Sequence, residues 1–82
     1  MIKNKKDLSI KLQNLKENEE INNVNLTALE IKKVIKQLNF GNDNVNINYS
    51  YYLQLKRDIK GIENKKIYPT FWLKNNKIIW EW

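Results

Sequence analysis

The residues of this chain that could do chemistry are mostly cationic, and five of them are clustered. Residues 56–66 hold five basic and two acidic side chains, a net charge of +3; the basic ones are Lys56, Arg57, Lys60, Lys65 and Lys66. Clustered ammonium and guanidinium groups attract phosphate whatever the base sequence, and added salt weakens that attraction. The chemistry that this cluster offers is therefore electrostatic binding of a polyanion.

Catalytic chemistry has little support, because the 82 residues include no histidine and no cysteine. Their absence excludes thiol catalysis, nucleophile–histidine pairs, disulfides and zinc sites built from these ligands. Glu17, Glu19, Glu20 and Glu30 show no paired spacing tied to a pocket, and we interpret them as solvated helix charges. The two glycines lie twenty residues apart and form no phosphate-binding loop. We expect a non-enzymatic protein with no cofactor and no metal.

The whole chain is basic, with 15 Lys and Arg against nine Asp and Glu, a formal charge of +6 and a pI near 9.6. Such a balance makes nucleic acid or another anionic surface the first partner to consider. Asn, Lys and Ile make up 39 of the 82 residues, and Lys outnumbers Arg by 14 to 1, as AT-rich codon usage would produce. Genome bias and solvated helix faces are therefore the alternative origin of the charge.

The length predicts one domain over residues 1–82, with residues 1–6 flexible. No apolar run approaches the roughly 20 residues of a membrane helix. The first twenty residues are interrupted by charged and amide side chains, so they lack the apolar core of a signal peptide. We expect a cytoplasmic protein without membrane contact, from a bacterium or from a phage or other mobile element.

Hydrophobic periodicity predicts two helices in the first half of the chain. Leu8, Leu12 and Leu15 recur at helical spacing and predict a helix that Asp7 caps and that ends near Lys16. A capping box from Thr27 to Glu30, followed by a left-handed stop at Gly41, predicts a second helix over 27–39. Its inward face is apolar: Ala28, Ile31, Val34, Ile35 and Leu38. Its opposite face is basic: Lys32, Lys33 and Lys36.

Two periodicities compete between Gly41 and Gly61. Apolar residues at alternate positions predict a half-buried strand over 44–51: Val45, Ile47, Tyr49 and Tyr51. Apolar residues at helical spacing predict instead a helix that Ser50 caps and that ends at Gly61: Tyr52, Leu55, Ile59 and Ile62. The helical stripe is longer, so we favour a helix from Ser50 onward.

The C-terminal residues predict an antiparallel hairpin with strands over 67–74 and 77–82. Asn75 and Asn76 separate them, and Asn tolerates the positive φ that a type I′ turn needs at both positions. The resulting register makes one face wholly apolar and inward: Leu73 opposite Ile78, Phe71 opposite Trp80, and Pro69 near Trp82.

On the other hairpin face the register pairs Trp72 with Ile79. Three environments are open for Trp72 there: stacking on an unpaired base, burial in a partner or homodimer interface, or packing beneath the N-terminal helix.

The order of these elements over residues 7–82 resembles a winged helix-turn-helix domain. The resemblance implies an α+β fold with two or three helices packed on a C-terminal antiparallel hairpin. It also implies that the third helix enters the DNA major groove while the hairpin wing touches backbone or minor groove. By position, it places Ser50, Gln54, Arg57 and Lys60 in the groove, and Lys74 and Lys77 on the wing.

The segment between the second and third helices departs from that pattern. Residues 40–49 form a connection longer than the usual turn of about three to four residues. A plain α+β domain, in which Val45 to Tyr49 joins the hairpin as a third strand, explains the same signals.

Three functions fit these patterns. The first is a small DNA-binding regulator or accessory factor of a phage or mobile element, weakly sequence-specific because one Arg limits bidentate guanine contacts. Its candidate interface is Ser50, Gln54, Lys56, Arg57, Lys60, Lys65, Lys66, Lys74 and Lys77. The second is a protein-interaction module, such as a phage-type inhibitor or an immunity protein, anchored by Trp72 and Ile79. The third is a ribonucleoprotein subunit, with RNA as the partner.

Overall fold

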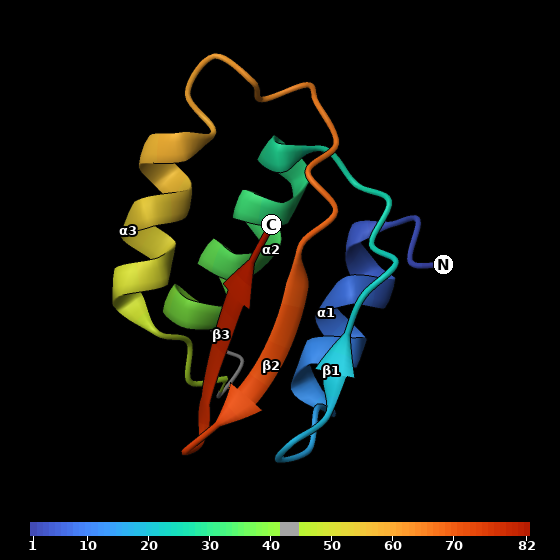
Figure 1. The fold of residues 1–82 in the computed structure, drawn as a ribbon, viewed down its shortest axis with the longest axis vertical. Helices are drawn as coiled ribbons and strands as arrows, with labels where there is room; N and C mark the ends of the chain where they lie inside the picture. Colours follow the sequence, from blue (N-terminus) through green and yellow to red (C-terminus); the bar gives the residue numbers. More distant parts are fainter. Residues whose placement is uncertain (42–44) are drawn as a thin grey trace.

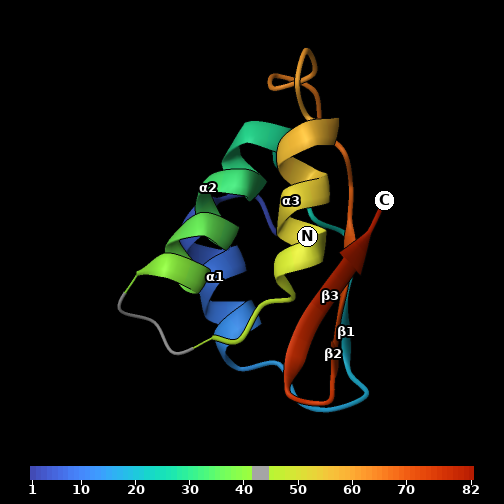
Figure 2. The ribbon, with the colours of Figure 1, turned by 90° about the vertical axis from the view of Figure 1, so that its left-hand side faces the viewer.

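The computed structural model describes residues 1–41 and 45–82, and these residues form three helices and three strands. In chain order they are α1 (Lys5–Gln13), β1 (Glu20–Ile21), α2 (Ala28–Phe40), α3 (Tyr49–Asp58), β2 (Thr70–Lys74) and β3 (Lys77–Glu81). The strands form one antiparallel sheet in the order β1-β2-β3 (Figure 1). The three helices lie on one side of that sheet, and none of them covers its other face (Figure 2). The α+β class expected from the sequence is confirmed.

The hairpin follows the predicted register. Phe71 lies opposite Trp80, Leu73 opposite Ile78 and Trp72 opposite Ile79. The turn residues Asn75 and Asn76 have φ values of 51° and 63°, as a type I′ turn requires. The first strand of the hairpin, β2, begins at Thr70, directly after the buried Pro69, and not at residue 67 as predicted.

One hairpin residue is not where the alternation put it. Trp82 was expected on the inward face, but it follows the end of β3 and remains 45% exposed. The last ladder pair is Thr70 with Glu81, so no opposite strand orients the Trp82 ring.

The core lies between the sheet and the three helices. The sheet contributes Phe71, Ile78 and Trp80, all at most 2% exposed. The helices contribute side chains of their apolar stripes: Leu8 and Leu12 from α1, Ile31, Val34, Ile35 and Leu38 from α2, and Tyr52 and Leu55 from α3. The inward faces predicted for α2 and for the centre of the hairpin are thus confirmed.

The capping box of α2 is confirmed as well. Thr27 Oγ1 accepts a hydrogen bond from the Glu30 backbone N–H (3.2 Å), and the Glu30 carboxylate accepts one from the Thr27 N–H (3.0 Å). The hydrogen bonds from Thr27, and then nearby Lys5 and Lys66, hold the pKa of Glu30 below its ordinary value. The other early amides of the helix donate to the 63–65 loop: Ala28 N–H to Lys65 O, and Leu29 N–H to Glu63 O. The loop after α3 is therefore fastened to the start of α2.

Replacing Thr27 with alanine should destabilise the fold by about 1 kcal/mol, because the Glu30 amide loses its acceptor. Urea unfolding of Thr27→Ala and wild type at neutral pH measures this cost. Because its pKa is lowered, the ionised Glu30 carboxylate stabilises the fold at pH values above its ordinary pKa of 4.5. This stabilisation is lost as the pH falls through the lower pKa that Glu30 has in the folded protein. The variant keeps the Thr27 N–H that donates to Glu30 and loses only the hydrogen bond from Thr27 Oγ1 to Glu30 Oε1, so the stability difference between the two proteins should narrow only partly in acid. A difference that is absent at neutral pH contradicts the role of the cap.

The end of α2 differs from the prediction, because Gly41 is not left-handed. Its φ is −96° and its ψ is −154°, and its N–H still donates to Gln37 O at 2.7 Å. A Cβ at Gly41 would lie 2.3 Å from Gln37 O. Glycine is required here for close backbone approach and not for positive φ.

The N-terminal helix begins earlier than its leucines predict. Asn4, not Asp7, is the cap: its side chain accepts from the Asp7 N–H at 2.8 Å. We expected residues 1–6 to be flexible, but Ile2 is 9% exposed and exchanges backbone hydrogen bonds with Asn23 and Asn25. The N-terminal segment therefore extends the β1 side of the fold, and α1 ends at Gln13 instead of near Lys16.

The helical interpretation of the segment after residue 48 is confirmed. Asn48, not Ser50, caps α3 by accepting from the Ser50 N–H at 3.0 Å. The competing strand is reduced to one bridge, in which Ile47 lies beside Ile78 of β3. Its first position, Asn44, lies outside the described residues. The helix ends at Asp58, and Gly61 follows in a turn with a φ of 88°.

Candidate functional site

The nine residues of the candidate interface are all exposed, but they fall into three groups. Ser50, Gln54, Lys56, Arg57 and Lys60 belong to α3 and the turn that follows it. Lys65 and Lys66 lie in the loop that covers the start of α2, where Thr27 bridges to Lys66. Lys74 and Lys77 flank the β2–β3 turn, which lies at the opposite end of the molecule from that loop (Figure 1).

The side of α3 that faces the hairpin is not basic. Asp58 and Gln54 line a recess of about 260 Å³ there, together with Tyr51, Trp80, Glu81 and Trp82. Lys56 lies two residues on from Gln54, or about 200° around the helix, whereas Arg57 lies three residues on and only about 60° from Gln54. Gln54 is thus separated from Lys56 but not from Arg57.

A lysine of α2 and a lysine that follows α3 approach each other where α3 ends. The two helices run alongside each other in opposite directions (Figures 1 and 2). Hydrogen bonds from the N–H groups of Glu63 and Gly61, and then nearby Lys32 and Lys60, hold the pKa of Glu63 below its ordinary value. One α2 lysine and one lysine after α3 therefore lie close to the same carboxylate.

Positions four residues apart extend this basic surface along α2. Lys32, Lys36 and Phe40 follow one strip of the helix, since residues four apart are neighbours on a helix surface. At one end of the strip Lys32 lies near Lys60. At the other end the Phe40 ring packs against the Tyr52 ring of α3, with ring centroids 5.4 Å apart. We call this surface the basic flank: Lys32, Lys36, Lys56, Arg57 and Lys60.

Sequence reasoning left two residues of the basic flank, Lys32 and Lys36, out of the candidate interface. Helical spacing placed Lys32 and Lys36 away from the apolar stripe of α2, but no local sequence pattern could reveal that α3 lies beside them. The signal that could have found them is the Phe40 position, an apolar residue on the same polar strip.

The outer face of the sheet forms a second exposed surface, centred on Trp72 and Ile79. Both side chains are half-buried. The Trp72 indole Nε1 donates to Glu20 Oε2 at 3.0 Å, and Glu20 lies opposite Trp72 in β1. Packing of Trp72 beneath the N-terminal helix is wrong, because the helices cover the other face (Figure 2).

The glutamates also differ from their prediction, because three of the four lie outside helices and all four accept hydrogen bonds. Glu17 Oε1 accepts from the Asn75 N–H at 2.9 Å, and Glu19 Oε1 from the Lys16 N–H at 2.9 Å. Glu20 holds Trp72, and Glu30 completes the cap of α2. These carboxylates fasten turns and strands together, a role that helix patterns do not reveal.

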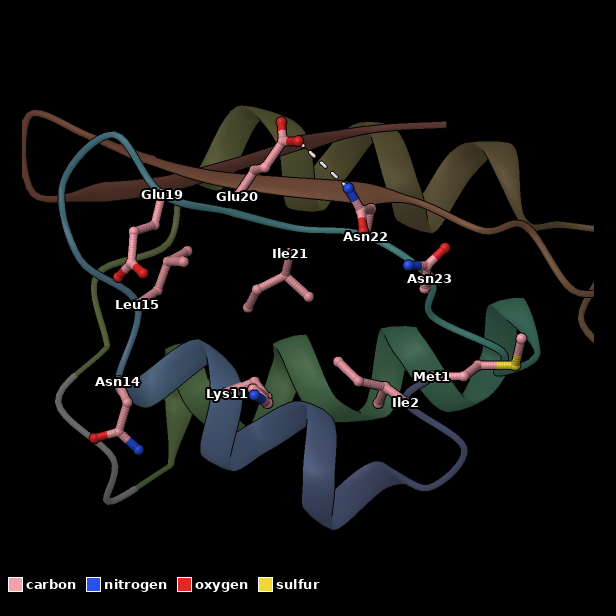
Figure 3. Close-up of a pocket in the computed structure, with 10 residues that line it drawn as sticks. All are labelled: Met1, Ile2, Lys11, Asn14, Leu15, Glu19, Glu20, Ile21, Asn22 and Asn23. Carbon is pink, nitrogen blue, oxygen red and sulfur yellow. Dashed lines mark hydrogen bonds between the residues drawn. The ribbon is translucent and has the colours of Figure 1, made fainter.

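The space between β1, α1 and the N-terminal segment is an open recess of about 390 Å³ (Figure 3). Ile2 and Ile21 point into it, and polar side chains such as Lys11, Asn14 and Glu19 also line it. The Glu20 carboxylate turns away toward the Asn22 amide, which donates to it at 3.3 Å.

Residues 1–41 and 45–82 contain no cluster of His, Cys, Asp and Glu side chains suited to a metal ion. None of their helices combines the length and apolar character needed to cross a bilayer. Comparisons with protein families, with curated proteins and with solved structures found no match for this chain.

Proposed function

We propose that this protein binds nucleic acid through the basic flank, as a small regulator or accessory factor, and that DNA is the preferred ligand over RNA. The observation that carries the proposal is that Lys32 of α2 and Lys60 after α3 lie near the same carboxylate, while Lys36 and the last-turn cations Lys56 and Arg57 belong to the same two adjacent helices. Of these, Lys36, Lys56, Arg57 and Lys60 are exposed. Their charges are therefore available to phosphate groups without any rearrangement of the core.

The recognition we propose is weakly sequence-specific. Lysine contacts to phosphate position a nucleic acid but do not read bases. Arg57 is the one arginine of the chain, so bidentate contact with guanine is limited to a single residue.

The winged helix-turn-helix resemblance enters the proposal as a mode of docking in which α3 meets a groove and the β2–β3 turn contacts neighbouring backbone. The element order and the exposed Lys74 and Lys77 support this mode. Two features of the structure differ from this docking mode. First, α2 and α3 run alongside each other, whereas helix-turn-helix pairs cross at about 90–120°. Second, the β2–β3 turn lies far from Lys65 and Lys66, so one straight duplex would contact only some of the nine residues.

A salt titration tests the proposal. Affinity for labelled DNA, measured by fluorescence anisotropy, should fall steeply with salt because each neutralised phosphate contributes a slope of about −0.9 in log K against log salt. Contact by most of the five flank cations predicts a loss on the order of a hundredfold between about 50 and 200 mM salt. Binding that is absent at low salt, or that is indifferent to salt, rejects the proposal.

A second function is favoured by a specific observation on the outer sheet face. Trp72 and Ile79 lie on the face that no helix covers, and the carboxylates of Glu20 and Glu81 border them. A tryptophan beside an aliphatic side chain on an uncovered face suits a protein partner, with Trp72 as its anchor. An inhibitor or immunity protein would use such a surface.

A further inference from the structure

Three large apolar side chains remain exposed at one end of the basic flank. Phe40 is 57% exposed, Tyr49 is 54% exposed and Leu53 is 45% exposed. Phe40 and Tyr49 are in contact, with ring centroids 6.1 Å apart, and Leu53 lies one helical turn after Tyr49. A contiguous exposed apolar patch on a small protein commonly marks a binding surface.

The rings of this patch are held in place from below. Phe40 makes edge-to-face contacts with Tyr49 and with Tyr52, and Tyr52 is only 5% exposed. Aromatic pairs in this geometry stabilise each other beyond their buried area. Phe40 is thus fixed against the core side of α3 while more than half of its surface faces solvent.

The patch is bordered by cations. Phe40 lines a shallow recess of about 270 Å³ with Lys33, Lys36, Gln37 and Gly41. On α3, Lys56 and Arg57 lie three and four residues after Leu53, so they follow it on the same side of the helix. An occupant of this surface must therefore offer flat apolar groups and negative charge together.

The cations around the patch distinguish between two possible ligands, a second copy of this chain and a nucleic acid. A second copy of this chain would place Lys36, Lys56 and Arg57 against the same cations, which is unfavourable. A nucleic acid offers both phosphates for the cations and bases for the rings. In a duplex the base faces are stacked against one another, so the rings can be used only when bases are unpaired.

We infer that the basic flank binds single-stranded nucleic acid, with unpaired bases stacked on Phe40 and Tyr49 and with the backbone following α3 toward Arg57. This inference rests on the proposed function and specifies its ligand. Tyr49 and Arg57 are eight residues apart, about 12 Å along a helix, so a strand contacts rings and cations along one short path.

The test measures anisotropy of a labelled oligothymidylate and of a hairpin duplex with a strand of the same length, at one low salt concentration. Wild type should prefer the single strand. Phe40→Ala should weaken single-strand binding at least about fivefold and leave duplex binding unchanged, since stacking on one aromatic side chain contributes at that level. Phe40→Leu keeps an apolar side chain next to Tyr52 but removes the ring, and it should show the same selective loss.

Trp82→Ala is the matched control, because Trp82 is a 45% exposed aromatic that shares its recess with Asp58 and Glu81. It should leave both affinities unchanged. Salt-sensitive binding without single-strand preference, or Phe40 variants equal to wild type, overturns this inference while the proposed function stands. If the protein binds neither the single strand nor the duplex, both this inference and the proposed function are wrong. Concentration-dependent dimerisation that Phe40→Ala abolishes, measured by sedimentation, assigns the patch to a second copy and also overturns the inference.

Discussion

Reversing the charge of Arg57 and Lys60 together should remove most of the nucleic-acid affinity and leave the protein folded. Each reversal removes an attraction of about 1 kcal/mol near phosphate and adds a repulsion of similar size. Two reversals then lower affinity by roughly a hundredfold to a thousandfold, since 1.4 kcal/mol is about tenfold. The salt slope should also fall by about two, one for each lost phosphate contact. Anisotropy titrations of Arg57→Glu with Lys60→Glu at several salt concentrations measure both quantities.

The fold should tolerate these changes because both side chains are exposed and neither packs in the core. Arg57 lies in the last turn of α3, where a cation complements the helix dipole, so its reversal costs up to about 1 kcal/mol of stability. Circular dichroism and urea unfolding of the variant check that the loss of binding is not a loss of structure.

Two further double variants carry the same change in net charge. Lys3 and Lys16 are exposed and belong to the α1 side of the chain, so changing both to Glu should cost much less affinity than changing the flank. Changing Lys74 and Lys77 to Glu tests the wing: a loss as large as that of the flank variant supports winged docking. If Lys3→Glu with Lys16→Glu weakens binding as much as the flank variant does, the affinity follows net charge and the proposed interface is wrong.

The protein-interaction alternative predicts the opposite sensitivity. A partner protein anchored on the outer sheet face would be weakened by Trp72→Ala and would be indifferent to the Arg57 and Lys60 reversals. Trp72 is held by Glu20, which is exposed, so its removal leaves no buried polar group. The two sets of variants therefore separate the two functions in one binding assay for each ligand.

Short-range patterns predicted the elements of this fold well because their causes are local. The capping box of Thr27 and Glu30 needs only four residues, and the turn at Asn75 and Asn76 fixes the whole hairpin register. Cap positions were less predictable, since Asn4 and Asn48 cap helices that Asp7 and Ser50 were expected to cap. In a chain with 14 Asn residues, many positions offer an equivalent side-chain oxygen to a helix start.

The candidate site was less predictable because tertiary packing makes it. Periodicity assigned Lys32 and Lys36 to a polar face of α2, and only the position of α3 makes that face part of the proposed binding surface. The same reasoning joined Lys65 and Lys66 to Lys60 from sequence proximity. The structure fastens these two lysines to the start of α2, through the Ala28 N–H to Lys65 O hydrogen bond and the bridge between Thr27 and Lys66, which sequence proximity did not predict.

The strongest test of the fold that positions this surface is Phe71→Ala. Phe71 is fully buried at the centre of the sheet, between Ile21 of β1 and Trp80 of β3. Removing a buried phenyl ring costs about 3–5 kcal/mol, through lost burial and the cavity left behind. At about 0.05–0.15 kcal/mol per residue, a chain of this length has roughly 4–12 kcal/mol of stability in total. The variant should therefore unfold at far lower urea concentration, or be largely unfolded in buffer, as followed by tryptophan fluorescence.

Phe40→Ala provides the matched comparison, because it is the same substitution at a ring that is 57% exposed. Its cost should be about 1 kcal/mol, from the lost contacts with Tyr49 and Tyr52. Phe71→Ala should lose nucleic-acid binding in proportion to its unfolded fraction, because the helices of the basic flank are held together against the sheet that Phe71 anchors. If Phe71→Ala and Phe40→Ala unfold at equal urea concentrations, the helices do not pack on this face of the sheet, and the basic flank loses the scaffold that assembles it.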